Sequence, residues 1–145
     1  MDTQALRLEH CSIMSLASRL GGIAGAVKTR GDAHDARALI LTIDDKLQGH
    51  LAEEDAELYP ALMAAPDAAT RTLGVSAFEE MGGIVGAWVN YRDHWTSDAI
   101  LGDPRRFATT TEGVMGALSL RIEMENDILY PAMDRLTAGR GLAAA

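Results

Sequence analysis

Apolar residues return every three or four positions in four separate blocks of this chain. That spacing places them along one face of an α-helix, whereas a half-buried strand alternates at every second position. The blocks predict four helices, near residues 3–28, 33–63, 69–100 and 104–136. Four long helices with short connections pack most simply as an up-down-up-down bundle. We therefore expect an all-α four-helix fold.

Capping and helix-breaking residues refine the limits of these blocks. Asp2 or Thr3 is suited to cap the first predicted helix, and Asp32 is suited to cap the second. Pro60 and Pro131 fall inside helical patterns. Because proline lacks a backbone N–H, each should bend or end its helix.

The length and composition favour one helical domain. The chain has 145 residues, of which 48% are hydrophobic and only 5% aromatic. Sandwiches of β-sheets need more aromatic and β-branched residues than this. We expect a single domain over residues 1–145, with its core at about 4–136 and a frayed tail, "TAGRGLAAA".

Charge and cysteine content limit the expected partners and location. There are 13 basic and 21 acidic residues, and a net charge of -8 argues against nucleic acid and anionic membranes. No apolar run approaches the roughly 20 residues needed to span a bilayer. The opening, "MDTQALRLEH", does not resemble a signal peptide, and Cys11 is the single cysteine. These features predict a soluble cytoplasmic protein.

One segment occurs in two related copies, "HLAEEDAELYPAL" at 50–62 and "RIEMENDILYPAM" at 121–133. Their alignment superposes Glu54 on Glu125 and one L-Y-P on the other. The first positions differ, because His50 aligns with Arg121. A histidine and a carboxylate four residues apart lie on one helix face and can chelate a cation.

Six ionisable residues are predicted to lie at one depth of the bundle. Counting helical turns from the predicted ends places them at one level, on or beside the apolar stripes. They are His10, His50, Glu54, Glu80, Arg121 and Glu125. Ionisable groups in a core cost free energy unless they pair or bind something. This level is therefore the predicted functional site.

The order of these residues resembles the hemerythrin-like HHE cation-binding domains. It comprises a lone helical histidine, H-x-x-x-E with L-Y-P, and a second x-x-x-E with L-Y-P. The likeness extends over roughly residues 4–136. It implies a four-helix bundle with a non-haem di-iron centre that binds O2 or responds to oxygen, nitric oxide or redox state.

The resemblance also implies metal ligands from the first helix and from both repeats, which are His10, His50, Glu54 and Glu125. The sequence departs from the family at two positions. Arg121 replaces the histidine of the second repeat, and Glu80 stands where the third helix usually offers histidine.

Two imidazoles and three carboxylates suit Fe(II), Mn(II) or Zn(II) better than Ca(II) or copper. Arg121 stays protonated and cannot ligate, but it can neutralise buried carboxylates in place of a second metal. Tyr59 and Tyr130 suit the core boundary, where either hydroxyl can donate a hydrogen bond to a ligand carboxylate.

Two functional hypotheses follow. In the first, the protein binds a metal ion, or a small diatomic ligand through it, in sensing, storage or detoxification. In the second, it is a metal-free sensory or interaction bundle, with Arg121 paired to Glu54, Glu80 and Glu125. No hydrolase triad, phosphate loop or dinucleotide motif is present, so an ordinary hydrolase or dehydrogenase has no support. A third alternative, a peroxidase-like redox enzyme with two metals, is the least favoured because too few ligands remain, and we expect no enzymatic activity.

Overall fold

The computed structural model describes the backbone of residues 1–144 and the side chains of residues 1–140. All regular secondary structure in this part is helical, which confirms the all-α prediction. In chain order the α-helices and the π-helical turns, η1 and η2, are α1 (Thr3–Ala24), α2 (Arg30–Glu53), η1 (Glu54–Leu58), α3 (Tyr59–Met63), α4 (Ala68–His94), α5 (Ser97–Gly102), α6 (Pro104–Met124), η2 (Glu125–Leu129) and α7 (Tyr130–Ala144).

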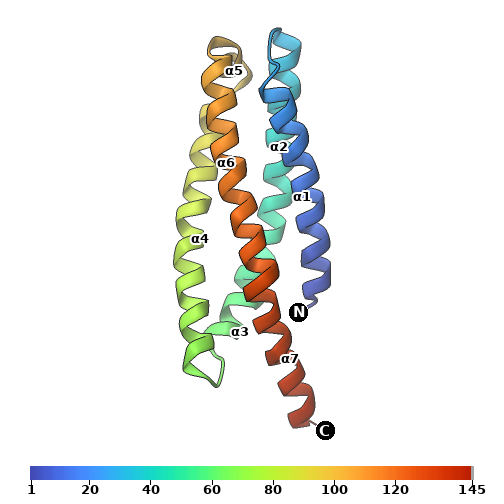
Figure 1. Ribbon diagram of the computed structural model, residues 1–145, viewed down its shortest axis with the longest axis vertical. Coiled ribbons are helices and arrows are strands. Elements are labelled where there is room, and N and C mark those ends of the chain that lie inside the picture. The colour runs from blue at the N-terminus through green and yellow to red at the C-terminus, as the bar shows by residue number, and fades with distance from the viewer. Residues whose placement is uncertain (145) are drawn as a thin grey trace.

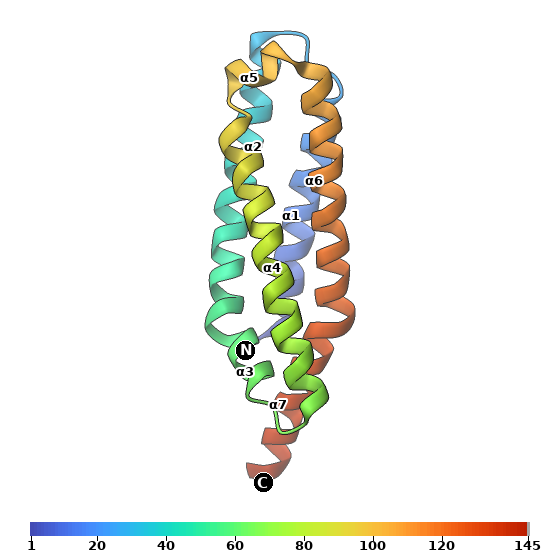
Figure 2. The same ribbon diagram turned by 90° about the vertical axis from the view of Figure 1, so that its left-hand side faces the viewer.

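The longest helices lie side by side as a bundle (Figure 1). Helix α1 contacts α2 and α6, and α4 contacts the same two helices. Viewed from the side, α4 lies in front of α1, with α2 and α6 to either side (Figure 2). Helix α5 lies at one end of the bundle, while α3 and α7 lie toward the other. Within residues 1–144, no helix has the length and apolar character needed to cross a bilayer.

Three predicted limits differ from the structure by more than three residues. The first helix stops at Ala24 instead of residue 28, with Gly25 as its C-cap. The third is interrupted before α5, because the Thr96 hydroxyl accepts from the Ala99 N–H and starts a new helix. The last helix continues past residue 136 to Ala144, since no proline follows Pro131 to stop it. Residue 145 of the predicted frayed tail lies outside the described residues.

The cap of the second helix also differs from the prediction. As expected, the Asp2 carboxylate caps α1, accepting from the N–H groups of Gln4 and Ala5. Helix α2 is instead capped by Thr29, whose hydroxyl accepts from the Asp32 N–H at 3.1 Å. The Asp32 carboxylate accepts from the Thr29 N–H at 3.0 Å, which completes a capping box.

Both L-Y-P copies begin with the last residue of a wider helical turn. In η1 and η2, Tyr59 and Tyr130 donate their N–H groups to the carbonyls of Glu54 and Glu125, five residues earlier. Such π-helical turns are rare in proteins as a whole, but those that occur are often found at functional sites. They interrupt the α-helix just before each proline, as the prolines predict. Each turn begins with a buried carboxylate residue.

The core has two apolar clusters with a charged layer between them. The first contains Ile13, Leu20, Ile40, Ile43, Leu47, Trp88, Tyr91, Phe107, Leu118 and Ile122. The second contains Leu6, Leu58, Tyr59, Leu62, Ala77, Met81, Leu129, Tyr130 and Met133. The buried charged and imidazole side chains come between these positions along α1, along α2 and η1, and along α6 and η2, and they are His10, His50, Glu54, Arg121 and Glu125.

Close packing against α3 sets the rotation of α4. A Cβ atom added to Gly74 would lie 2.8 Å from the Leu62 Cβ and 3.2 Å from the Leu62 carbonyl carbon. Gly74 lies on the buried face of α4, which also contains Ala77, Met81, Trp88 and Tyr91. Phe78, which the sequence pattern predicts to face the core, is 48% exposed. The side of α4 that faces the core is therefore rotated relative to the side that the sequence pattern predicts.

We expect the Gly74→Ala variant to lose about 1–3 kcal/mol of unfolding free energy, because the added methyl overpacks against Leu62. Gly82 is a matched control on the same helix, because apart from its own helical turn no described residue has an atom within 4 Å of an added Cβ. Gly82→Ala should gain up to about 1 kcal/mol. Urea unfolding measures both. Equal stabilities for the two variants would contradict the packing described for α4.

Candidate metal centre

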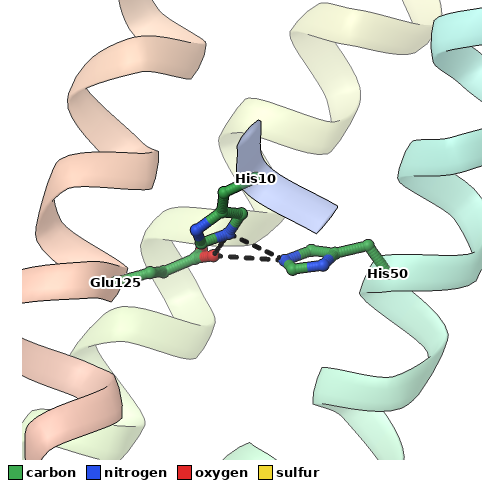
Figure 3. A group of neighbouring side chains, drawn as sticks. All are labelled: His10, His50 and Glu125. Carbon is green, nitrogen blue, oxygen red and sulfur yellow. Dashed lines mark hydrogen bonds and ion pairs between the residues drawn. The ribbon is translucent and has the colours of Figure 1, made fainter. Parts of the chain in front are cut away.

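Three side chains suited to bind metal converge from separate helices (Figure 3). His10 Nε2 lies 3.0 Å from His50 Nε2 and 3.0 Å from Glu125 Oε1. His50 Nε2 lies 3.5 Å from the same Glu125 oxygen. All three residues are buried. Their ligand atoms therefore share one small volume in the charged layer of the core.

Local helical spacing directs these side chains inward. His10 lies four residues after Leu6 and three before Ile13, both of which are buried. His50 lies three residues after buried Leu47 and four before buried Glu54. Residues three and four apart share one helix face, so each histidine must point to the core with its neighbours.

Two residues missed by the sequence analysis orient the imidazoles. His10 Nδ1 donates to Asn126 Oδ1 at 2.7 Å, and His50 Nδ1 donates to Glu9 Oε2 at 2.6 Å. Metal-binding histidines commonly donate their second N–H in this way. In the sequence, Glu9 directly precedes His10 and Asn126 directly follows Glu125. Their position next to predicted ligands is the sequence signal that could have identified them.

Glu54 brings a second carboxylate to the cluster. It is fully buried, and its Oε2 accepts a hydrogen bond from the Tyr130 hydroxyl at 3.0 Å. Its Oε1 lies 3.5 Å from His50 Nε2 and has no hydrogen-bond partner among the described residues. Burial raises the pKa of Glu54, and the nearby negative charge of Glu125 raises it further.

The pKa values of Glu125 and His50 shift in opposite directions, and both shifts favour the charged form. Burial opposes ionisation of Glu125, but hydrogen bonds from His10, His50 and Arg121 hold its pKa well below the ordinary value. Burial also opposes protonation of His50, but its hydrogen bond to Glu125 and the charge of Glu54 raise its pKa to about 9. At neutral pH, His50 therefore holds a proton unless a metal ion takes its place.

Comparison with known families agrees with this geometry. A family model described as the hemerythrin HHE cation-binding domain matches residues 1–133. The chain belongs to this family. Searches of curated proteins and of solved structures found no match. In this hemerythrin HHE domain, His10, His50 and Glu125 form the group of ligand atoms that could hold the cation.

Arg121 occupies the histidine position of the second repeat in this hemerythrin HHE domain. Its Nε donates to Glu125 Oε2 at 2.8 Å, and its Nη2 donates to the Tyr59 hydroxyl at 2.5 Å. The residue is only 4% exposed, and its Nη1 has no hydrogen-bond partner among the described residues. The guanidinium thus contributes a permanent positive charge beside the Glu125 carboxylate.

The prediction that Glu80 lies in the charged layer of this hemerythrin HHE domain is wrong. Glu80 is exposed on α4, at an apolar cavity of about 320 Å³ that Leu47 and Trp88 also line. The reason is the rotation of α4, which turns Ala77 and Met81 inward instead. Neither side chain is a carboxylate or an imidazole, so α4 supplies no ligand of those types to the cluster.

The two repeat tyrosines of the hemerythrin HHE domain have different partners. The Tyr130 hydroxyl donates to Glu54, as predicted for a hydroxyl beside a ligand carboxylate. The Tyr59 hydroxyl instead accepts from Arg121. Burial raises the pKa of both phenols, and the charge of Glu54 adds to that effect. One tyrosine therefore lies with the histidines and the other with the arginine.

Proposed function

We propose that the protein holds one divalent transition-metal ion on His10, His50 and Glu125, with Glu54 beside them. The main support is the 3.0 Å separation of the two Nε2 atoms. Both Nδ1 atoms donate outward, so in their metal-binding, neutral form the two imidazoles would direct their Nε2 lone pairs at each other. A cation between them removes that repulsion and binds both nitrogens.

The donor set favours iron(II). Two imidazoles and a carboxylate are typical of non-haem Fe(II) sites, and Mn(II) and Zn(II) accept similar ligands. Bound iron would supply a redox-active centre that can take up a small diatomic ligand. The chain itself would hold the ligands in place through Glu9 and Asn126 and exclude water with its apolar clusters.

We further propose that the site is an incomplete di-iron centre. A guanidinium cannot ligate, and Arg121 stands where the second repeat would offer a histidine. Helix α4 offers Ala77 and Met81 instead of histidines. With one metal, we infer a role in oxygen, redox or nitric-oxide sensing, storage or detoxification, without enzymatic turnover. We also infer an up-down-up-down four-helix topology and a cytoplasmic location.

A metal-free sensory or interaction bundle is the second candidate. It is favoured by the pKa of His50, about 9, because a proton on its Nε2 can also separate the two imidazoles. The Arg121 pair with Glu125 would balance part of the charge in this state. The two candidates differ in one measurable property, which is the response of the fold to metal ions.

Iron(II) added without oxygen should raise the melting temperature of the parent protein. A ligand that binds only the folded state at 100 times its Kd adds about 2.7 kcal/mol of stability. His50→Ala should lose this response because it removes one ligand. His34→Ala is the control, since His34 is an exposed histidine on the same helix. Absence of any response of the parent to Fe(II), Mn(II) or Zn(II) would favour the metal-free bundle.

A further inference from the structure

The Tyr130 hydroxyl lies in the same small volume as the proposed ligand atoms. Its oxygen is 3.1 Å from His10 Nε2, 3.2 Å from His50 Nε2 and 3.3 Å from Glu125 Oε1. Those three atoms are 3.0, 3.0 and 3.5 Å from one another. All six distances among the four atoms thus fall within a narrow range.

Four atoms spaced in this way mark the corners of a nearly regular tetrahedron. Edges of 3.0–3.5 Å place the centre about 1.8–2.1 Å from each corner, close to the bond lengths of about 2.0–2.2 Å between zinc and nitrogen or oxygen. We propose that Tyr130 is the fourth ligand of the metal, bound through its phenolate oxygen. This inference rests on the proposed metal site and adds a ligand to it.

Packing fixes the Tyr130 ring where this role requires it. The residue is 0% exposed, and its ring stacks on His10 with centroids 5.3 Å apart. The Arg7 guanidinium lies 5.4 Å from the centre of the ring. Tyr130 also follows η2, the turn that begins with Glu125. The first residue of this π-helical turn and the residue that caps its end would therefore be two ligands of one metal.

The equivalent tyrosine of the first repeat cannot take this role. The Tyr59 hydroxyl accepts from Arg121 Nη2, so it faces the guanidinium. It has no hydrogen bond to either histidine in the described chain. The two repeats therefore contact each other crosswise. Tyr59 of the first copy contacts Arg121, the first residue of the second copy, and Tyr130 of the second copy contacts His50, the first residue of the first copy.

Binding through phenolate replaces the O–H bond of Tyr130 by a metal–oxygen bond, and the released proton passes to solvent. Anionic oxygen is a hard donor, so this ligand favours iron(III) over softer ions. Glu54, whose Oε2 accepts from the hydroxyl at 3.0 Å, stays beside the bound oxygen.

A tyrosinate bound to iron(III) gives a charge-transfer absorption in the visible region and enhanced tyrosinate vibrations in the resonance Raman spectrum. The test loads the protein with one equivalent of iron(II), oxidises it with ferricyanide and removes the reagent by desalting. We expect the band in the parent, and its loss in Tyr130→Phe with iron still bound. Iron affinity of that variant should fall at least about tenfold.

The chain contains three tyrosines, so variants at the other two serve as controls. Tyr59→Phe and Tyr91→Phe should both keep the band, which assigns it to Tyr130 by exclusion even where Tyr130→Phe fails to fold. Iron in the parent without the band, or a band that survives in Tyr130→Phe, would overturn the ligand assignment alone. A parent that binds no iron would overturn the proposed function and this inference together.

Discussion

The Arg121→Ala variant is expected to lose about 3–5 kcal/mol of unfolding free energy at neutral pH, as when one partner of a buried ion pair is removed. Arg121 is 4% exposed, and its guanidinium donates to Glu125 Oε2 at 2.8 Å. Without it, Glu125 keeps a buried negative charge with less compensation, and Tyr59 loses its hydrogen-bond donor. Urea unfolding of the metal-free proteins measures the loss.

The stability loss should depend on pH in a defined direction. Arg121 is one of the groups that hold the pKa of Glu125 low, so this pKa rises in the variant. A carboxylate with a depressed folded-state pKa stabilises the fold above its unfolded-state pKa, and this stabilisation is lost as the pH falls. The difference between parent and variant should therefore shrink as the pH drops through the raised pKa of Glu125.

Arg105→Ala provides the matched control, since Arg105 is exposed on the same helix, α6. That substitution should change the unfolding free energy by no more than about 0.5 kcal/mol. If Arg121→Ala were as stable as Arg105→Ala, or if its deficit stayed constant with pH, the guanidinium would not be balancing Glu125.

The Arg121→His variant should bind more divalent metal than the parent. The change restores H-x-x-x-E in the second repeat and removes a fixed positive charge. An imidazole at this position would join Glu125 Oε2, which now accepts from Arg121, and Glu54 Oε1, which has no hydrogen-bond partner in the described part of the chain. Two carboxylates and an imidazole can hold a second ion. Elemental analysis after anaerobic iron(II) loading should therefore give more than one iron per chain.

The Arg121→Lys variant removes the guanidinium but keeps a positive charge. It therefore tests whether loss of the guanidinium alone raises the iron content. Lysine keeps a positive charge and offers no imidazole, so its iron content should match that of the parent. Equal iron contents in the parent, the lysine variant and the histidine variant would show that Arg121 does not exclude a second ion.

Helix content and the depth of the site follow from the sequence because periodicity encodes them directly. His10, His50, Glu54 and Glu125 each occur on an apolar stripe, so burial of the stripe also buries the ligand. The prolines likewise predict an interruption after each carboxylate. They do not predict its form, since a bend, an end or a π-helical turn all accommodate proline.

The rotation of α4 could not be obtained from its apolar pattern. Phe78 and Met81 suggest overlapping stripes, and the choice between them depends on the close approach of Gly74 to Leu62. That contact joins two helices, so it leaves no periodic signal in either one. The error at Glu80 follows from this ambiguity, because a modest rotation moves that residue from the edge of the core to solvent.

The number of iron ions bound per chain tests the central claim most directly. Anaerobic calorimetric titration with iron(II), checked by elemental analysis after desalting, measures it on the intact parent protein. The arrangement of His10, His50 and Glu125, with Arg121 beside them, predicts one ion per chain. Two ions per chain with an oxo-bridged di-iron spectrum after oxidation, or no bound iron, would contradict it.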